Sequence, residues 1–431
     1  MVSSRRKSLK IRRWIGIIMK VEILCTGDEV LSGKIINSNF AFMSGKLEEV
    51  GISVIWGTTV GDNKQDLLDA FKLASQRADA VIVNGGLGPT VDDLSQEVAA
   101  IASGNELELR TDWLEIMESF FIKRGRVMTE NNKKKAMLPK GAELINNPIG
   151  TACGFAININ KSRFFFTPGV PRELFLMLED EIIPRLLELS GEKFMTKLKT
   201  FHSYGIGESR ADTLLEDIVD LAPDKNVKLG FQAHFPQLET KLHVRGNSKN
   251  SIEKNLAPVQ DELRKRLGNY IFAEDKQTLE GVIIESLKNN SQTISIAEFM
   301  TDGGINSRLS KTDTGGESLI YALASNNIYA LCKSLEINHK NKVNLELAEQ
   351  VALKTRDIYS TDFGFCVLIN HTEKNEAETF IALSGQISQS RIGYFIGDNY
   401  RVTLGSIEMA LDCIRRYFHG LPFDEKSDFE R

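Results

Sequence analysis

Residues 80–93 read AVIVNGGLGPTVDD, an apolar run followed by a glycine-rich loop and two acids. The first four residues have the length and composition of a buried strand, and the helix expected after Asp92 and Asp93 favours negative charge at its N-terminus. The glycines suit backbone N–H groups that face an anion, and Thr90 can donate to a phosphate. The loop is neither a Walker loop nor a G-x-G-x-x-G dinucleotide loop. We predict a phosphate-binding loop; a tight connection with Asp92 or Asp93 as helix N-cap is the alternative.

A second loop, Gly27-Asp28-Glu29, directly follows an apolar run at residues 21–25. The glycine lets the backbone approach a ligand closely, and two adjacent carboxylates are hard oxygen ligands for a divalent cation. An ordinary strand-to-helix turn with Asp28 as a cap is the alternative.

The pattern around these loops predicts an α/β fold. Strand candidates at residues 21–25, 53–58 and 80–83 alternate with helical stretches at 39–49 and 64–77. Such alternation indicates a mostly parallel sheet with helices on both faces. Ligands bind such sheets where loops leave the carboxyl ends of strands, so we expect both loops to share one site.

Later segments complete this domain and suggest two more. A hairpin is predicted at 154–159 and 163–167, and a helix at 172–188 that Pro184 interrupts and kinks. The flanking segments 147–152 and 167–173 are candidates for a rigid lip over a ligand. A smaller α+β unit is expected at about 196–275. A last unit at about 276–425 opens with a helix, a strand at 293–297 and a turn at 301–304.

The composition indicates a globular protein without a strong net electrostatic field. The 431 residues include 53 basic and 58 acidic side chains, and the formal charge of −5 favours neither nucleic acid nor an anionic membrane. The five cysteines are widely spaced, without a Cys-x-x-Cys pair, which favours a reducing cytoplasmic location over disulfides or a zinc site. No apolar run approaches the roughly 18–20 residues of a membrane span.

The first 18 residues differ from the rest, because they carry six basic residues and no acid. The apolar run after them is too short for a signal peptide, and residues 20–24 already resemble the first buried strand. We interpret Met19 as the natural start and residues 1–18 as a non-native or disordered extension. A basic membrane-surface anchor is the alternative.

Taken together, four ordered motifs resemble those of the CinA family, and the resemblance covers essentially the whole chain from Met19. The motifs are Gly27-Asp28-Glu29, the segment 83–90 with Asp92-Asp93, the segment 147–151, and Pro168-Gly169-Val170-Pro171. The resemblance implies a three-layer molybdopterin-binding (MoaB/Mog-like) domain at 19–190. It further implies a small KH-like domain at 196–275, a C-terminal α/β CinA domain at 276–425, and a homodimer.

The resemblance also implies a function in NAD recycling. The first domain of the family is associated with divalent-metal-dependent hydrolysis of ADP-ribose to AMP and ribose 5-phosphate, and its motifs are intact here. We therefore predict a pyrophosphatase with catalytic Asp28, Glu29 and Asp93, and with metal ligands Asp28, Asp92 and Asp93. Predicted to bind the nucleotide substrate are Gly27, Asn84, Gly85, Gly86, Gly88, Thr90, Gly150, Thr151, Pro168 and Gly169.

Two roles in this predicted site stay open. Either Glu29 or Asp93 can serve as general base. The run Lys133-Lys134-Lys135 either assists at the phosphates or forms a solvated helix face. Magnesium, manganese and cobalt are the candidate cations, with potassium as a further candidate.

The C-terminal domain departs from the family pattern at its chemical centre. The family's deamidase motif, Ala-Glu-Ser-Cys-Thr-Gly-Gly, acts on nicotinamide mononucleotide, with the serine as proposed nucleophile. Here Phe299 occupies the serine position and has no hydroxyl to attack an amide. The family's second glycine-rich segment is replaced around residues 368–373. We expect deamidation to be lost and the domain to persist as a scaffold or oligomerisation unit.

Two other functions compete with hydrolysis. The first domain could bind molybdopterin or a nucleotide without turning it over. A nucleic-acid adaptor would use the KH-like domain, but a gripping KH loop needs Gly-x-x-Gly with basic character. Gly205-Ile206-Gly207-Glu208 has the wrong spacing and carries an acid, so we expect no nucleic acid partner.

Overall fold

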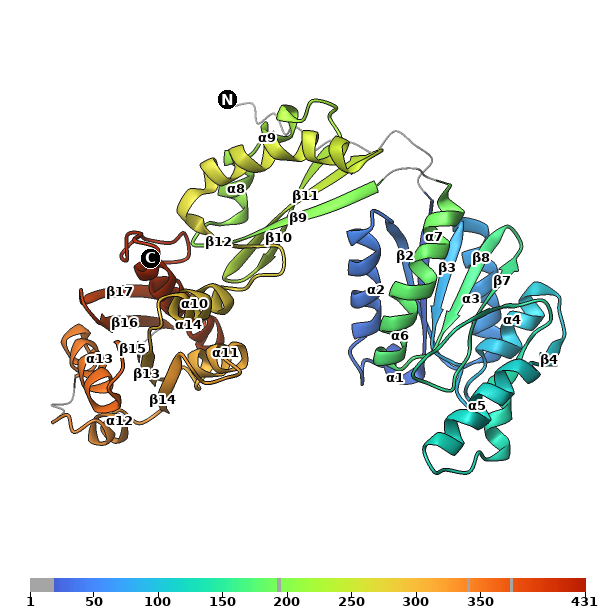
Figure 1. Ribbon diagram of the computed structural model, residues 1–431, viewed down its shortest axis with the longest axis horizontal. Coiled ribbons are helices and arrows are strands. Elements are labelled where there is room, and N and C mark those ends of the chain that lie inside the picture. Colours follow the sequence, from blue (N-terminus) through green and yellow to red (C-terminus); the bar gives the residue numbers. More distant parts are fainter. Residues whose placement is uncertain (1–18, 192–194, 339–341, 373–374) are drawn as a thin grey trace. The chain divides into compact units, whose positions relative to one another are not determined.

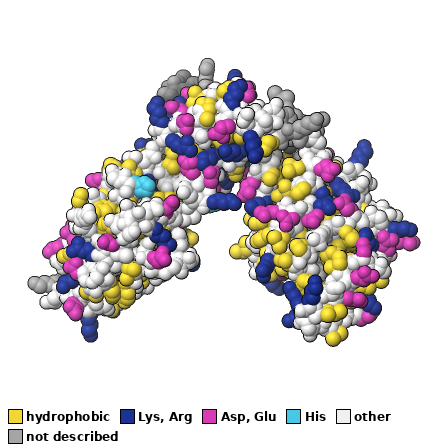
Figure 2. Space-filling view, viewed as in Figure 1, with side chains coloured by type: hydrophobic (Ala, Val, Ile, Leu, Met, Phe, Trp, Pro, Cys, Tyr) yellow, Lys and Arg dark blue, Asp and Glu magenta, His cyan; other side chains and the backbone are white. Residues whose placement is uncertain are grey.

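The computed structural model describes residues 19–191, 195–338, 342–372 and 375–431, and Figure 1 shows its helices and strands. The chain divides into two compact units, Met1–Lys197 and Leu198–Arg431. The predicted extension at residues 1–18 lies outside the described residues. In each unit, acidic and basic side chains are interspersed on the face that Figure 2 shows. No helix among the described residues has the length and apolarity that crossing a membrane requires.

The first unit is built on a six-stranded sheet of order β2-β1-β3-β8-β7-β6. Its four parallel strands are β2 (Val54–Val60), β1 (Val21–Thr26), β3 (Ala80–Asn84) and β8 (Ser162–Thr167). The antiparallel strands are β7 (Gly154–Ile159) and β6 (Glu143–Ile145). The predicted strands and hairpin are thus confirmed, with ends that differ by one or two residues.

Helices cover both faces of this sheet and make three layers (Figure 1). Successive residues of β1 point to opposite faces, so Ile23 packs in one core and Leu24 in the other. The Ile23 side holds α2 (Ser38–Glu49), α6 (Pro171–Met177) and α7 (Ile183–Ser190). The Leu24 side holds α3 (Lys64–Arg77), α4 (Ser95–Ser103) and α5 (Thr111–Lys123). Short elements complete the unit: α1 (Asp28–Leu31), β4 (Leu107–Leu109), the 3-10 helix Glu130–Ala136 and β5 (Met137–Pro139).

The predicted helix at 172–188 is interrupted at Pro184, but by a wider turn rather than a simple kink. A π-helical segment, Leu178–Ile182, separates α6 from α7, and Pro184 lies in the first turn of α7. Proline has no N–H to donate and its ring crowds the carbonyl four residues earlier. The π turn accommodates both effects, so the chain stays helical until Gly191, whose φ is 60°.

The second unit contains two sheets. The order of the four-stranded sheet is β10 (Val227–His234), β11 (Gln237–Gly246), β9 (Met195–Tyr204) and β12 (Ile271–Glu274). The helices packed with it are α8 (Glu208–Leu214) and α9 (Lys249–Leu267), with 3-10 turns at Ile218–Leu221 and Gly268–Tyr270. The order of the five-stranded sheet is β14 (Leu319–Ser325), β13 (Ile294–Phe299), β15 (Phe363–His371), β16 (Glu376–Ser384) and β17 (Gln389–Ile396).

Helices cover both faces of the five-stranded sheet as well. One core contains α10 (Leu279–Asn289), α11 (Gly304–Thr312) and α14 (Asn399–Phe418), and the other contains α12 (Ile328–Ser334) and α13 (Leu345–Tyr359). The predicted boundary near residue 275 falls inside this second unit. Buried Arg415 of α14 crosses it by donating to the backbone carbonyls of Asn269 and Ile271.

An ion pair with one buried partner joins β1 to the last turn of α3 in the first unit. Glu22 of β1 is 0% exposed, and its carboxylate accepts two hydrogen bonds from Arg77 and one from Thr58 Oγ1 at 2.7 Å. A buried charge is tolerated when it is paired and fully hydrogen-bonded, and removing one partner leaves the other desolvated and unpaired.

We therefore expect Arg77→Met to lower the free energy of unfolding by about 3 kcal/mol, near the lower end for a broken buried pair because Arg77 is partly exposed. Urea unfolding of the full chain measures it. The double variant Glu22→Gln/Arg77→Met should recover more than half of the loss. Lys64→Met breaks the exposed pair with Glu97 and is the matched control, expected to cost less than about 1 kcal/mol. An equal loss of unfolding free energy in Arg77→Met and Lys64→Met would contradict the assignment of Glu22 and Arg77 as a pair with one buried partner.

Candidate functional site

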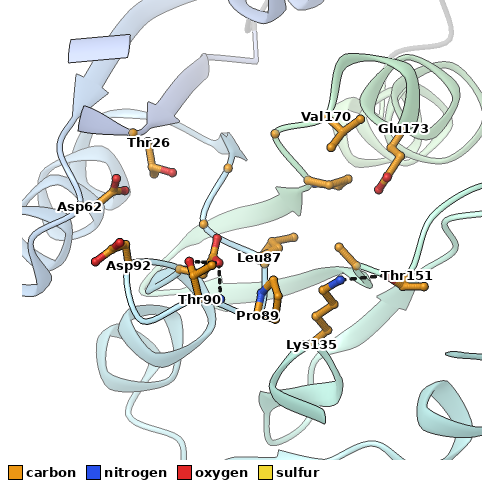
Figure 3. A pocket seen from close by; sticks show the side chains of 18 of the residues that line it. Thr26, Asp62, Leu87, Pro89, Thr90, Asp92, Lys135, Thr151, Val170 and Glu173 are labelled. Carbon is orange, nitrogen blue, oxygen red and sulfur yellow. Dashed lines mark hydrogen bonds between the residues drawn. The ribbon is translucent and has the colours of Figure 1, made fainter. Parts of the chain in front are cut away.

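A cavity of about 510 Å³ opens at the carboxyl ends of the parallel strands of the first unit (Figure 3). The loops after β1, β2, β3 and β8 all reach it, together with residues near 135 and 151. The lining residues are Thr26, Gly27, Glu29, Asp62, Gly85, Gly86, Leu87, Gly88, Pro89, Thr90, Asp92, Asp93, Lys135, Thr151, Ala152, Pro168, Gly169, Val170 and Glu173. The two loops quoted from the sequence therefore share one cavity.

The glycine loop after β3 has a backbone conformation that favours glycine at two positions. Gly85 and Gly86 have φ of 112° and 69°, in the region that favours glycine. A Cβ at Gly88 would lie 2.4 Å from Asp93 Oδ2, so only glycine lets this carboxylate fold back on the loop. Asp93 Oδ2 accepts hydrogen bonds from the Thr90 N–H at 2.8 Å and from Thr90 Oγ1 at 2.6 Å. Asp93 thus fixes the shape of the loop that it follows.

Carboxylates gather at one end of the cavity, where Glu29, Asp62 and Asp92 belong to three different loops. Burial raises the pKa of Asp62, while the hydrogen bond from the Asp28 N–H opposes the rise. The negative charges of Asp28, Glu29 and Asp92 raise the pKa of Asp62 further. Like charges that repel one another in this way are stabilised by a cation.

Asp28 lies beside this acidic end but does not line the cavity. Its Oδ1 accepts from the Asp62 N–H at 3.1 Å, while Asp62 Oδ2 accepts from the Asp28 N–H at 3.1 Å. A Cβ at Gly61 would lie 2.4 Å from Asp28 Oδ1, so this carboxylate is packed against the neighbouring loop. The position predicted for Asp28 in the cavity is occupied instead by Asp62, and Asp28 joins the two loops.

Two predicted ligand-binding residues lie behind the cavity wall. Asn84 is 4% exposed, and its Nδ2 donates to Thr167 Oγ1 at 3.1 Å and to the Pro168 carbonyl at 2.7 Å. Its Oδ1 accepts from Asn39, which also donates to the Gly169 carbonyl. A short polar network thus holds the Pro168-Gly169 lip against β3.

Gly150 is the second of these residues. A Cβ there would lie 2.3 Å from Glu173 Oε2, so its missing side chain makes room for the Glu173 carboxylate. The remaining predicted positions, namely Gly27, Gly85, Gly86, Gly88, Thr90, Thr151, Pro168 and Gly169, all line the cavity.

A lysine and a glutamate line the opposite end of the cavity. Lys135 is half-buried and its Nζ donates to Thr151 Oγ1 at 2.9 Å. Burial lowers the pKa of Lys135, and the carboxylates of Glu173 and Asp93 oppose the change. The other two lysines of the run are used elsewhere: Lys134 donates to the Thr90 carbonyl and Lys133 pairs with Glu130. Only one of the three therefore faces the cavity.

The sequence prediction missed Asp62, left Glu173 without an assigned role, and did not decide whether Lys135 assists at the phosphates or lies on a solvated helix face. Asp62 follows β2, which pairs with β1 in parallel, so its place after a predicted strand was the signal that could have found it. Lys135 could not be told from its two neighbours, because a 3-10 helix turns each of them in a different direction.

No preformed metal centre is found in the part of the chain that the structure describes, since no three His, Cys, Asp or Glu side chains converge closely enough. Mg²⁺ seldom uses an all-protein cage, because it keeps several waters and takes one or two carboxylates plus substrate phosphates. Glu29 and Asp92 accept no side-chain hydrogen bond or ion pair from described residues, which leaves their oxygens available. The acidic end therefore fits a cation that a phosphate ligand helps to hold.

The turn that follows β13 in the second unit differs in its chemistry from the turn that follows β1 in the first unit. Phe299 ends β13, and Met300 and Asp302 follow with φ of 61° and 52°. Buried Glu298 accepts from Thr301 Oγ1 at 2.6 Å and from the N–H groups of Ile305 and Asn306 at 3.1 Å. Its oxygens are thereby used to cap α11.

The segment that replaces the family's second glycine-rich loop is part of a regular hairpin. Residues 368–371 lie in β15, paired with β16, and residue 373 lies outside the described residues.

Ionised Asp62 should destabilise the fold at neutral pH. The pKa of Asp62 is raised in the folded protein above its value in the unfolded chain. The ionised carboxylate therefore lowers the free energy of unfolding. This loss is absent below the unfolded pKa and appears as pH rises through the folded pKa. Asp62→Asn keeps an acceptor for the Asp28 N–H and removes the charge. We expect the variant to have a higher Tm than the parent at about pH 7, and this gain to shrink towards about pH 3.

Thermal unfolding without divalent cations measures this difference. Asp69→Asn, at an exposed position of α3, is the control and should show no such trend. A Tm difference between Asp62→Asn and the parent that grows towards acidic pH would contradict the prediction.

Comparison with known proteins agrees with this architecture. Residues 22–188 match a family described as a probable molybdopterin binding domain, and residues 198–273 match the damage-inducible protein CinA KH domain. A CinA-like protein of Geotalea uraniireducens is 32% identical over 424 residues, covering 95% of this chain and 100% of the relative. One from Shewanella woodyi is 39% identical over 352 residues, covering 80% and 81%.

A crystal structure of the protein CinA from Thermoplasma acidophilum, described as having unknown function, is 31% identical, with a TM-score of 0.36. It covers 38% of this chain and 96% of that chain. The predicted molybdopterin-binding-like and KH-like folds are confirmed by the matched families. Because one relative matches along nearly the full length of both sequences, the chain belongs to the CinA-like protein family.

Proposed function

We propose that the first unit is a divalent-metal-dependent pyrophosphatase that hydrolyses ADP-ribose to AMP and ribose 5-phosphate. The observation that carries the proposal is one cavity in which a glycine loop lies between an acidic end and a lysine. A diphosphate has several negative charges, and its hydrolysis places more charge on the bridging oxygen. Such a reaction needs fixed positive groups at the phosphates, which this arrangement can supply.

The glycine loop is the first group that would hold the phosphates. Gly86 and Gly88 line the cavity without a side chain, so their N–H groups can approach phosphate oxygens closely. Thr90 Oγ1 donates to Asp93, which holds the loop in shape before a ligand arrives. A preorganised loop loses little conformational entropy when it binds.

Asp62 and Asp92 are the residues that would hold the cation. When bound there, a divalent cation would neutralise phosphate charge and lower the pKa of a coordinated water. Asp28 would act by positioning, because its carboxylate holds the Asp62 loop. Magnesium, manganese or cobalt remain the predicted cations, and potassium stays a prediction without an assigned residue.

Glu29 is the better candidate for the general base. A base needs an available oxygen that faces the cavity, and Glu29 accepts no side-chain hydrogen bond from the described residues. Asp93 lines the same cavity, but its Oδ2 already accepts two hydrogen bonds from Thr90, so that oxygen is occupied within the loop. Asp93 would therefore orient the loop rather than remove the proton.

Full-length protein should release AMP from ADP-ribose when a divalent cation is added, and chelation should stop the reaction. Asp92→Asn and Asp93→Ala should each lower kcat/KM by at least about 100-fold, the scale of losing one preorganised electrostatic group. Chromatographic detection of AMP measures both. Asp69→Ala, on α3 outside the cavity, is the matched control and should keep full activity. No AMP release with magnesium, manganese or cobalt would sink the proposal.

The alternative is a protein that binds molybdopterin or a nucleotide without turning it over. The match to a probable molybdopterin binding domain favours it, because the matched residues include the whole cavity. Calorimetry with molybdopterin and with ADP-ribose separates the two: tight molybdopterin binding without AMP release favours the alternative.

For the second unit we propose a scaffold without nicotinamide mononucleotide deamidase activity. Phe299 has no nucleophilic oxygen, and the nearby Glu298 carboxylate is used by α11. Full-length protein should therefore release no ammonia from nicotinamide mononucleotide above the background of a buffer control, in a coupled ammonia assay. Release that saturates with substrate would refute this. A homodimer, a cytoplasmic location and a place in NAD recycling remain predictions.

A further inference from the structure

Helix α5 carries apolar side chains on two faces, and the first unit covers only one of them. Trp113 and Met117 are buried in the core on the inner face. On the outer face, Ile116 is 50% exposed and Ile122, in the last turn, is 75% exposed. Figure 1 shows α5 at the periphery of the first unit. A surface helix usually presents charged and polar residues outward, so these two isoleucines require an explanation.

A groove of about 440 Å³ runs along the outer face of α5. Its lining residues on the helix follow one another at spacings of three and four, which places them on one face. They are Asp112, Glu115, Ile116, Ser119, Phe120 and Lys123. The other wall of the groove is formed by residues of the segment 146–150. The groove is therefore a separate surface from the cavity at the strand ends.

The charges on this face are divided between the two ends of the helix. Glu115 lies near the amino end, and Lys123 is the last residue of α5. Both are exposed, and neither forms an ion pair with a described residue. An acid near the start of a helix and a base near its end also suit the helix dipole. The dipole does not account for the exposed isoleucines that lie between these charges.

We propose that this face of α5 docks onto the same face of a second copy of the chain, with the two helices antiparallel. The two-fold axis passes through Ser119, the small residue at the centre of the face. Residues at equal distances before and after position 119 then meet across the axis. Glu115 meets Lys123 of the partner subunit, and Ile116 meets Ile122 of the partner subunit.

Charge complementarity favours a second copy as the occupant. The antiparallel arrangement pairs opposite charges twice, whereas a parallel one would place Glu115 against the same carboxylate of the partner subunit. The small side chain of Ser119 lets the two helices approach closely at the axis. The inference does not depend on the proposed hydrolysis, because none of these side chains lines the cavity.

The second wall of the groove connects this surface to the candidate site. Asn147 lines the groove, and its Nδ2 donates to Glu173 Oε2 at 2.7 Å. Its Oδ1 accepts from the Gly150 N–H at 3.0 Å, next to Thr151 in the cavity wall. A partner helix in the groove would thus contact the loop that shapes one end of the cavity.

Sedimentation velocity of the full chain tests the docking. The parent protein should sediment as a dimer at micromolar concentration. Ile116→Glu removes an apolar contact in each copy and should raise the Kd of the dimer by at least about 100-fold. Because Ile116 is half-exposed, this variant should keep the Tm of the parent. Glu188→Lys, at an exposed position of α7, is the matched control and should leave the Kd unchanged.

Charge reversal tests the antiparallel pairing itself. Glu115→Lys and Lys123→Glu should each raise the Kd by at least about ten-fold, because each places like charges together twice across the two-fold axis. The double variant Glu115→Lys/Lys123→Glu restores opposite charges. Its Kd should return to within about three-fold of the parent value, whereas two unrelated effects would add.

Hydrogen–deuterium exchange locates the interface independently of its affinity. Amides of residues 111–123 should exchange more slowly in the parent than in Ile116→Glu at equal concentration, while amides of residues 198–273 should exchange equally in both. A monomeric parent overturns the inference and leaves the groove to another occupant. A dimer whose Kd is unchanged in Ile116→Glu, or losses that add in the double charge variant, also overturn it.

Discussion

Parallel pairing of β1 with its two neighbours is the constraint on which the candidate site depends. The register aligns Thr26 with Val60 and Cys25 with Asn84, so three loops leave the sheet at the same edge. Asn84 is aligned in turn with Thr167 of β8, which brings the Pro168-Gly169 lip to that edge. Because side chains alternate between faces, a slip of one residue would exchange the side chains of the two cores and would separate Glu22 from Arg77 and Thr58.

Glycines at this edge mainly make room for polar side chains of the protein itself. Positions 85, 88 and 150 each lie against an oxygen, from Thr26, Asp93 and Glu173 respectively. A methyl group at any of them would displace that oxygen or the loop beside it. The glycine-rich loop is therefore shaped as much by its own acidic and hydroxyl side chains as by the need to approach a phosphate.

The two units place comparable turns at comparable points but use them differently. After β1 and β2 the carboxylates of Glu29 and Asp62 line a cavity, whereas the carboxylate of Glu298, near the end of β13, caps the helix that follows. Burial raises the pKa of Glu298, and its three hydrogen bonds oppose that rise. A buried acid with its oxygens occupied contributes to the fold, while exposed acids that repel one another are suited to bind a cation.

Local patterns in the sequence determined most of the fold and the location of the site. Apolar runs and helical periodicity predicted strands β1, β2, β3, β7 and β8 and helices α2 and α3 within one or two residues, because each buries a face of known period. The short strands β4, β5 and β6 and helix α5 were not predicted. They also predicted that the glycine loop and the Gly27-Asp28-Glu29 turn meet, since parallel strands carry their following loops to one edge.

Only the tertiary structure decided which side chains line the cavity. Asp28 and Asp62 lie on neighbouring loops that two hydrogen bonds join. Only Asp62 lines the cavity, and the Asp28 carboxylate is packed against the Asp62 loop. Lys135 was likewise indistinguishable from its neighbours until the packing of the 3-10 helix directed one of three lysines inward. The direction of a side chain in an irregular loop depends on contacts with residues distant in sequence, and no local period encodes those contacts.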